Sequence, residues 1–186
     1  FVGDTMYDVY TKMEKLFDIS QALKEYALEK DSFVLATIHR DFNTDNPEKL
    51  SQIIDSLNRL SKDIKVLFPM HPRTKKLAAC LGKEILFEVT EPIGYLQLQA
   101  LVKASKLVVT DSGGLQKESY YAGKRGVVVM PDTGWRELTD CGWNILSSPS
   151  QIYENTIKAI NENRPYPTNI YGNGNAAEKI TNAILK

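Results

Sequence analysis

The sequence predicts an α/β fold, a Rossmann-like parallel sheet of about six strands with helices on both faces. Five short apolar runs rich in β-branched residues have the length and composition of buried strands, and a weaker sixth follows them. Longer stretches with apolar residues at helical spacing separate these runs. Such alternation of strand and helix is typical of a parallel sheet that helices cover on both sides.

The expected strands are 33–38, 64–68, 84–87, 106–110 and 126–130, with the weaker run at 144–146. The expected helices are about 46–61, 73–81, 94–104, 114–122, 150–163 and 175–185, preceded by one N-terminal helix at about 7–29. In the helix at 46–61, Pro47 stands in the first turn, where proline is favoured. The 186 residues fit one domain of ordinary size.

Composition excludes several classes of partner. The chain holds 23 Lys and Arg against 23 Asp and Glu, so its formal net charge is zero and no global field attracts nucleic acid or an anionic membrane. No apolar run approaches the ~18 residues that span a bilayer. Cys80 and Cys141 lie far apart, as free thiols in a reducing compartment do, and a cytoplasmic location is expected.

The segment Thr110–Gly114 follows a predicted strand and begins a helix. Its small residues Ser112, Gly113 and Gly114 let the backbone approach a ligand closely, and free N–H groups at a helix start suit a phosphate. Glu118 lies one helical turn further on, where its carboxylate could accept two hydrogen bonds from a sugar diol. A capped turn without a ligand and a solvated glutamate are the alternative interpretations.

Both histidines of the chain come just after a predicted strand, and each has an arginine beside it. They are His39 with Arg40, and His71 with Arg73. Because ligands of open α/β sheets bind beyond the carboxyl ends of the strands, the two arginines are natural partners of a diphosphate, and ordinary surface charges are the alternative. No third and fourth ligand accompanies the histidines, so no metal is expected. Thr133 follows another strand and is a candidate helix cap.

These motifs together resemble those of one family, the non-hydrolysing UDP-N-acetylglucosamine 2-epimerases, over nearly the whole chain. The most specific motif is Asp111-Ser112-Gly113-Gly114-Leu115-Gln116-Lys117-Glu118 after a strand. The other matching motifs are Thr37-Ile38-His39-Arg40 with Asn43, Pro69-Met70-His71-Pro72, Glu91-Pro92-Ile93-Gly94-Tyr95, Ala122-Gly123-Lys124, Gly142-Trp143-Asn144 and Tyr171-Gly172-Asn173-Gly174.

The resemblance implies the C-terminal half of a two-domain fold of the glycosyltransferase B type, with UDP and UDP-N-acetylglucosamine as ligands and no cofactor. Ser112 and Gly113 would hold the diphosphate, with Gly114, Arg40, His71, Arg73 and Thr133 in the same UDP site. Glu118 would bind the ribose, and His39 would be catalytic by steadying the leaving UDP. The family reaction interconverts UDP-N-acetylglucosamine and its manno epimer by eliminating UDP and adding it back.

The resemblance also implies a domain organisation. Residues 1–186 would be a single UDP-binding domain, residues 1–30 its crossover segment, and the N-terminal domain with the main acid-base carboxylates would be absent. The start at Phe1 without an initiator Met suggests a piece of a longer protein, inactive alone and possibly a homodimer at full length.

Three positions depart from the family pattern: Phe42 and Gly134 stand where a Glu is usual, and Met130 where an Arg is usual. Two other functions therefore stay open, a donor-binding domain of a glycosyltransferase and a non-catalytic UDP-sugar-binding module.

Overall fold

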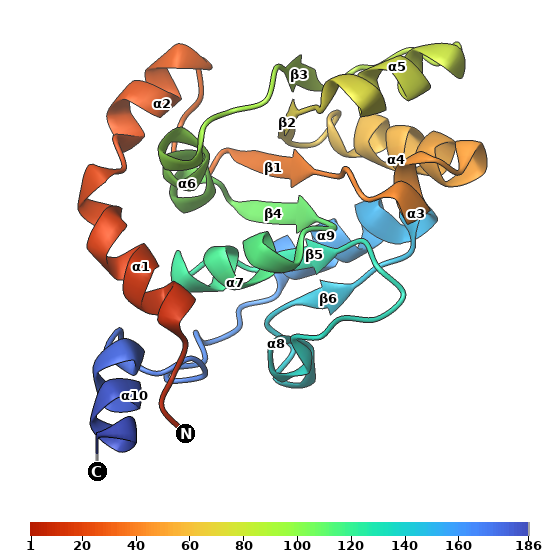
Figure 1. Cartoon of the computed structure of the whole chain (residues 1–186). Coiled ribbons are helices and arrows are strands. Elements are labelled where there is room, and N and C mark those ends of the chain that lie inside the picture. Colours follow the sequence, from red (N-terminus) through yellow and green to blue (C-terminus); the bar gives the residue numbers. More distant parts are fainter. Residues whose placement is uncertain (186) are drawn as a thin grey trace.

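The computed structural model describes residues 1–185 and confirms the Rossmann-like prediction (Figure 1). All six strands join one parallel sheet in the order β3-β2-β1-β4-β5-β6. The strands are β1 (Phe33–Thr37), β2 (Lys65–Pro69), β3 (Glu88–Thr90), β4 (Leu107–Thr110), β5 (Gly126–Val128) and β6 (Ile145–Leu146). Chain order reverses between the neighbours β1 and β4, and in such sheets this reversal is where ligands bind.

The α-helices are α1 (Thr5–Met13), α2 (Ile19–Glu25), α3 (Asp41–Thr44), α4 (Pro47–Leu60), α5 (Pro72–Cys80), α6 (Tyr95–Ala104), α7 (Gly113–Tyr121), α8 (Arg136–Asp140), α9 (Ile152–Asn161) and α10 (Ala176–Ile184). Two 3-10 turns, η1 (Glu14–Leu16) and η2 (Pro149–Gln151), precede α2 and α9. No helix among residues 1–185 combines the length and the apolar character that crossing a membrane requires.

Each face of the sheet has its own hydrophobic core, because successive side chains of a strand point to opposite faces. Val34 and Ala36 of β1 pack into the core under α4 and α9. Phe33 and Leu35 of the same strand pack into the core under α1, α2, α6 and α7. Helices therefore cover both faces of the sheet (Figure 1).

The prediction of a strand at 84–87 was wrong, because the strand begins only at Glu88. Asn58 of α4 donates to the Glu84 carbonyl and accepts from the Leu86 N–H, both at 2.8 Å. A side chain thus takes the backbone hydrogen bonds that a strand would have used. Pairing with β2 starts at Leu67 opposite Glu88.

The prediction of a single N-terminal helix at 7–29 was also wrong, because α1, η1 and α2 occupy this segment. The chain leaves helical geometry at Phe17, which is buried and has an extended backbone. Asp18 then starts α2 by accepting from the N–H of Gln21 at 2.9 Å. The other predicted strands and helices lie where the sequence placed them, with ends shifted by one or two residues, whereas the short helices α3 and α8 were not among the predicted ranges.

The N-terminal segment is fastened to the C-terminal helix and to α7. The Asp8 carboxylate of α1 accepts from the N–H groups of Ala176 and Ala177 and so caps α10. Asp4 pairs with Lys117 at 2.5 Å, and both side chains are largely buried. These contacts hold the two ends of the chain side by side (Figure 1).

Candidate functional site

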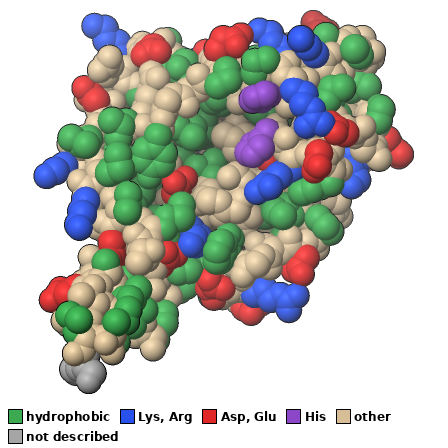
Figure 2. Space-filling model, viewed as in Figure 1, with side chains coloured by type: hydrophobic (Ala, Val, Ile, Leu, Met, Phe, Trp, Pro, Cys, Tyr) green, Lys and Arg blue, Asp and Glu red, His purple; other side chains and the backbone are tan. Residues whose placement is uncertain are grey.

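A cavity of about 430 Å³ opens at the carboxyl ends of β1, β2 and β4. It is lined by Thr37, Ile38, His39, Pro69, His71, Arg73, Thr74, Pro92, Ile93, Leu98, Ser112, Leu115 and Glu118. Figure 2 shows a hollow on this face, with the two histidine side chains next to each other at its rim. Residues from three strand ends and two helix starts therefore meet at one place.

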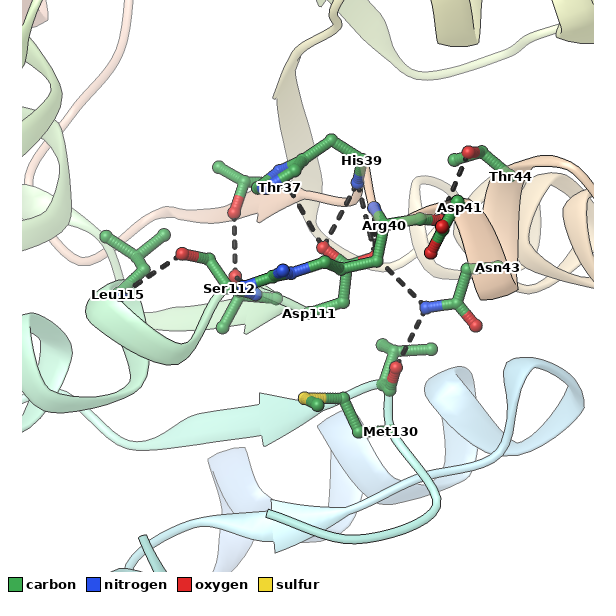
Figure 3. Close-up of polar contacts among 12 residues, drawn as sticks. Thr37, His39, Arg40, Asp41, Asn43, Thr44, Asp111, Ser112, Leu115 and Met130 are labelled. Atoms are coloured by element: carbon green, nitrogen blue, oxygen red, sulfur yellow. Dashed lines mark hydrogen bonds and ion pairs between the residues drawn. The ribbon is translucent and has the colours of Figure 1, made fainter. Parts of the chain in front are cut away.

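The buried carboxylate of Asp111 organises the edge of this cavity (Figure 3). Asp111 is fully buried. It accepts hydrogen bonds from the backbone N–H groups of His39 at 3.1 Å and Arg40 at 2.9 Å, and from the side-chain amide of Asn43 at 3.0 Å. Asp111 is not among the lining residues of the cavity, and it ties the loop after β1 to the loop after β4.

The end of β4 turns directly into α7. The Ser112 hydroxyl caps this helix by accepting from the Leu115 N–H at 3.4 Å, and the Ser112 N–H donates to the Thr110 hydroxyl at 3.0 Å. A helix leaves its first N–H groups without partners inside the helix, so those of Gly113 and Gly114 suit an anion together with the positive end of the helix dipole. Gly113 and Gly114 contribute backbone groups and no side chain.

The two histidines reach the cavity from different strands. His39 is half-exposed, and its Nδ1 lies 3.7 Å from an Asp111 oxygen. His71 caps α5, where its Nδ1 accepts from the N–H of Arg73 at 3.3 Å. With Nδ1 used as an acceptor, the neutral His71 ring carries its proton on Nε2, which is then a donor.

The two arginines differ in their position. Arg73 lines the cavity and pairs with Asp45, which neutralises part of its charge. Arg40 is exposed and does not line the cavity, although its backbone N–H belongs to the Asp111 cluster. Only the first of them is placed to contact a ligand in this cavity.

Glu118 lies on α7, lines the same cavity as the histidines and is partly buried. Burial raises the pKa of its carboxyl, and the nearby Gln99 and Tyr95 side chains and the charge of Lys117 offset part of that rise. The Glu118 carboxylate is thus a hydrogen-bond acceptor with little competition from water.

Thr133 lies outside the cavity lining and is nearly buried. Its hydroxyl donates to the Gln116 side chain at 2.6 Å and accepts from the Trp135 N–H at 3.1 Å. The helix α8 begins after Trp135 and has no side-chain cap, so the expectation that Thr133 caps a helix was wrong.

Sequence reasoning missed several residues of the site. Thr37 and Thr110 end neighbouring strands, and their hydroxyls share a hydrogen bond of 2.8 Å under the cavity. Pro92, Ile93 and Leu98 form an apolar wall that precedes and begins α6. Pro92 and Ile93 belong to the motif Glu91–Tyr95, which matched the family, but the strand before this motif was misplaced and the motif was not assigned to the site.

Residues 1–185 contain no group of three or more His, Cys, Asp or Glu side chains arranged to hold a metal ion. The site consists instead of a helix start, two imidazoles, one guanidinium and one carboxylate around a partly apolar cavity. The sheet and this cavity define a Rossmann-like α/β domain with its site at the switch point of the sheet.

The chain belongs to the UDP-N-acetylglucosamine 2-epimerase family. A family model with that description matches residues 1–185. The chain is 36% identical over its full length to UDP-2,3-diacetamido-2,3-dideoxy-D-glucuronate 2-epimerase of Pseudomonas aeruginosa, covering 52% of that protein. It is 33% identical over 99% of its length to UDP-N-acetylglucosamine 2-epimerase of Methanococcus maripaludis, covering 54% of it.

Among solved structures, the chain is similar to the Methanocaldococcus jannaschii UDP-GlcNAc 2-epimerase in complex with UDP-GlcNAc and UDP. The TM-score is 0.85 at 27% identity, over 99% of this chain and 54% of that one. The chain therefore spans about half the length of the relatives it matches.

Substitution of Asp111 by Ala tests whether the buried carboxylate holds the two loops together. We expect the free energy of unfolding to fall by about 3 kcal/mol, because three donors lose a charged acceptor in a buried site. Urea titration followed by circular dichroism measures this change. Asp41→Ala is the matched control, since Asp41 is exposed in the same loop and should change stability by less than about 1 kcal/mol. Equal effects of the two substitutions would contradict the role given to Asp111.

Proposed function

We propose that this chain is the UDP-binding domain of a UDP-sugar 2-epimerase. One observation carries the proposal: the start of α7, both histidines, Arg73 and Glu118 converge on a single cavity at the switch point of the sheet. Donors, a positive charge and one carboxylate therefore line the same cavity. A nucleoside diphosphate needs such an arrangement, because its diphosphate is an anion and its ribose a diol.

Each part of UDP has a proposed partner. The diphosphate binds the Ser112 hydroxyl and the N–H groups of Gly113 and Gly114, with His71 and Arg73 as further donors. Glu118 accepts hydrogen bonds from the ribose hydroxyls. The apolar wall of Pro92, Ile93 and Leu98 suits the flat face of the base.

His39 is the proposed catalytic residue. It lines the cavity beside the start of α7, and its Nδ1 lies 3.7 Å from an oxygen of the buried Asp111 carboxylate. Such an imidazole stabilises negative charge as it develops on a departing diphosphate. Elimination of UDP from a sugar also requires proton transfer at the sugar, for which this cavity offers no second free carboxylate besides Glu118.

The proposal therefore includes a second domain. The relatives are about twice as long as this chain, and we propose that their other half supplies the proton-transfer carboxylates. Residues 1–30 would then be the crossover segment, and residues 1–186 alone would bind the nucleotide without epimerising it. A homodimer of the longer protein and a cytoplasmic location belong to the same proposal.

The identity of the hexose is a separate matter from UDP. The relatives' printed substrates share UDP and differ in their sugar. In this chain, Met130 lines a second cavity together with Asn43 and Lys49, and Gly134 leaves open space where a side chain would extend. Phe42 does not line the cavity of the candidate site. The three departures from the family pattern thus lie outside the lining of that cavity, so the proposal names UDP and leaves the hexose open.

Calorimetric titration of the 186-residue chain with UDP and with uridine tests the proposal. UDP should bind in the micromolar to millimolar range, and uridine about tenfold more weakly or worse because it lacks the diphosphate. Ser112→Ala should weaken UDP binding several-fold without changing uridine binding. Ser150→Ala is the control on an exposed turn. The proposal fails if UDP does not bind at millimolar concentration, or if uridine binds as well as UDP.

The pH dependence of ribose recognition is a further prediction. The preference for UDP over 2′-deoxyuridine diphosphate should decrease as the pH falls through the pKa of Glu118, which burial raises, because a protonated carboxyl accepts fewer hydrogen bonds. Protonation of the histidines affects both nucleotides alike and cancels from the ratio of their dissociation constants. In Glu118→Gln the ratio should be small and constant with pH, and a wild-type ratio that is equally constant would contradict the role of Glu118.

A further inference from the structure

Two side chains of α6, Tyr95 and Gln99, lie near the carboxylate of Glu118. Tyr95 is the first residue of α6, and Gln99 lies one helical turn later on the same face of that helix. Glu118 lies on α7, which packs beside α6. Leu98 of α6 and Leu115 of α7 line the cavity together with Glu118, so the contact between these two helices forms one wall of the site.

Gln99 is an unusual residue for a helix contact. Its side chain is fully buried, and neither its amide nitrogen nor its amide oxygen has a hydrogen-bond partner among the described residues. A buried amide without a partner is unfavourable, and residues of this kind in native proteins are often part of a functional site. Gln99 approaches Glu118 closely enough to lower the pKa of its carboxyl, yet outside normal hydrogen-bond geometry.

Tyr95 is partly exposed at the start of α6 and interacts with the Glu118 carboxyl. Burial of the ring and the Glu118 carboxylate raise the pKa of the Tyr95 hydroxyl to about 12, so this hydroxyl keeps its proton and is a donor. The other ionisable groups near Glu118 are Lys117 and Tyr121 on its own helix and Tyr10 on α1, whose hydroxyl is buried without a partner among the described residues. Glu118 thus has two donor side chains of α6 beside it and lines the cavity.

We propose that Tyr95 and Gln99 are positioning residues that hold the Glu118 carboxylate toward the two hydroxyls of a ribose, and thereby select ribonucleotides over 2′-deoxyribonucleotides. The proposal rests on the proposed function, because it assumes that Glu118 meets the ribose. A diol requires both carboxylate oxygens at a defined angle, and two donor side chains from one helix restrict that angle. A glutamate on an exposed helix would rotate freely and would discriminate poorly.

The dissociation constants of UDP and 2′-deoxyuridine diphosphate, measured by calorimetry on the 186-residue chain, test this proposal. The wild-type chain should prefer UDP by about tenfold, which corresponds to one hydrogen bond to a charged group. Gln99→Met keeps the shape of the side chain and removes its amide, and Tyr95→Phe removes only a hydroxyl. Each should lower the preference to about threefold by weakening UDP binding, with binding of the deoxynucleotide unchanged.

Matched controls lie on the same or a distant helix. Gln97→Met removes an amide of α6 that instead donates to Glu25, and Tyr153→Phe removes a hydroxyl of α9 that donates to Asp63. Both should keep the tenfold preference. In a Glu118→Gln background, Gln99→Met should have no further effect on the preference, because the two residues act through one group.

The outcomes separate this proposal from the proposed function. If Glu118→Gln abolishes the preference while Gln99→Met and Tyr95→Phe leave it at about tenfold, Glu118 acts alone and the positioning role is overturned. A purely structural Gln99 would produce that same result, with a change in thermal stability only. If the wild-type chain binds no UDP at millimolar concentration, the proposed function fails and this inference fails with it.

Discussion

The hydrogen bonds to the buried carboxylate of Asp111 are the interaction on which the site depends. A charge in that position requires several donors, since a buried carboxylate without them is strongly unfavourable. The donors come from the loop after β1, so the chain can satisfy Asp111 only by folding that loop against the end of β4. The same contacts place His39 beside the start of α7. A structural requirement of the buried charge thus fixes the geometry of the candidate active site.

The proposed anion site of this protein relies on local donors rather than on a global field. The formal net charge of the chain is zero, and the acid Asp45 already pairs with one of the arginines near the cavity. What remains for a diphosphate is a helix start, one hydroxyl and donors on two imidazoles, all within one partly apolar cavity. Fixed donors of this kind bind an anion without a strong field, because they need no reorganisation when the ligand arrives.

Much of the fold and part of the site followed from sequence patterns. Apolar runs identified five of the six strands, and the position of His39 and His71 just after two of them correctly indicated a shared edge. The third strand was misplaced because Asn58, distant in sequence, takes its backbone hydrogen bonds. Thr133 was predicted to cap a helix because it follows a strand. Its hydroxyl instead donates to Gln116 on α7, a contact that the local sequence does not indicate. The function of a residue was predictable where it depended on strand direction, and unpredictable where it depended on a long-range side-chain contact.

A crystal structure of this chain grown with UDP tests the central claim most directly. The claim is that the junction held by Asp111 forms an anion site between β1 and β4. The account predicts diphosphate oxygens within hydrogen-bond distance of the Ser112 hydroxyl and the Gly113 N–H, with His39 alongside and the ribose hydroxyls at Glu118. A nucleotide bound elsewhere on the chain, or a diphosphate directed away from the start of α7, would contradict it.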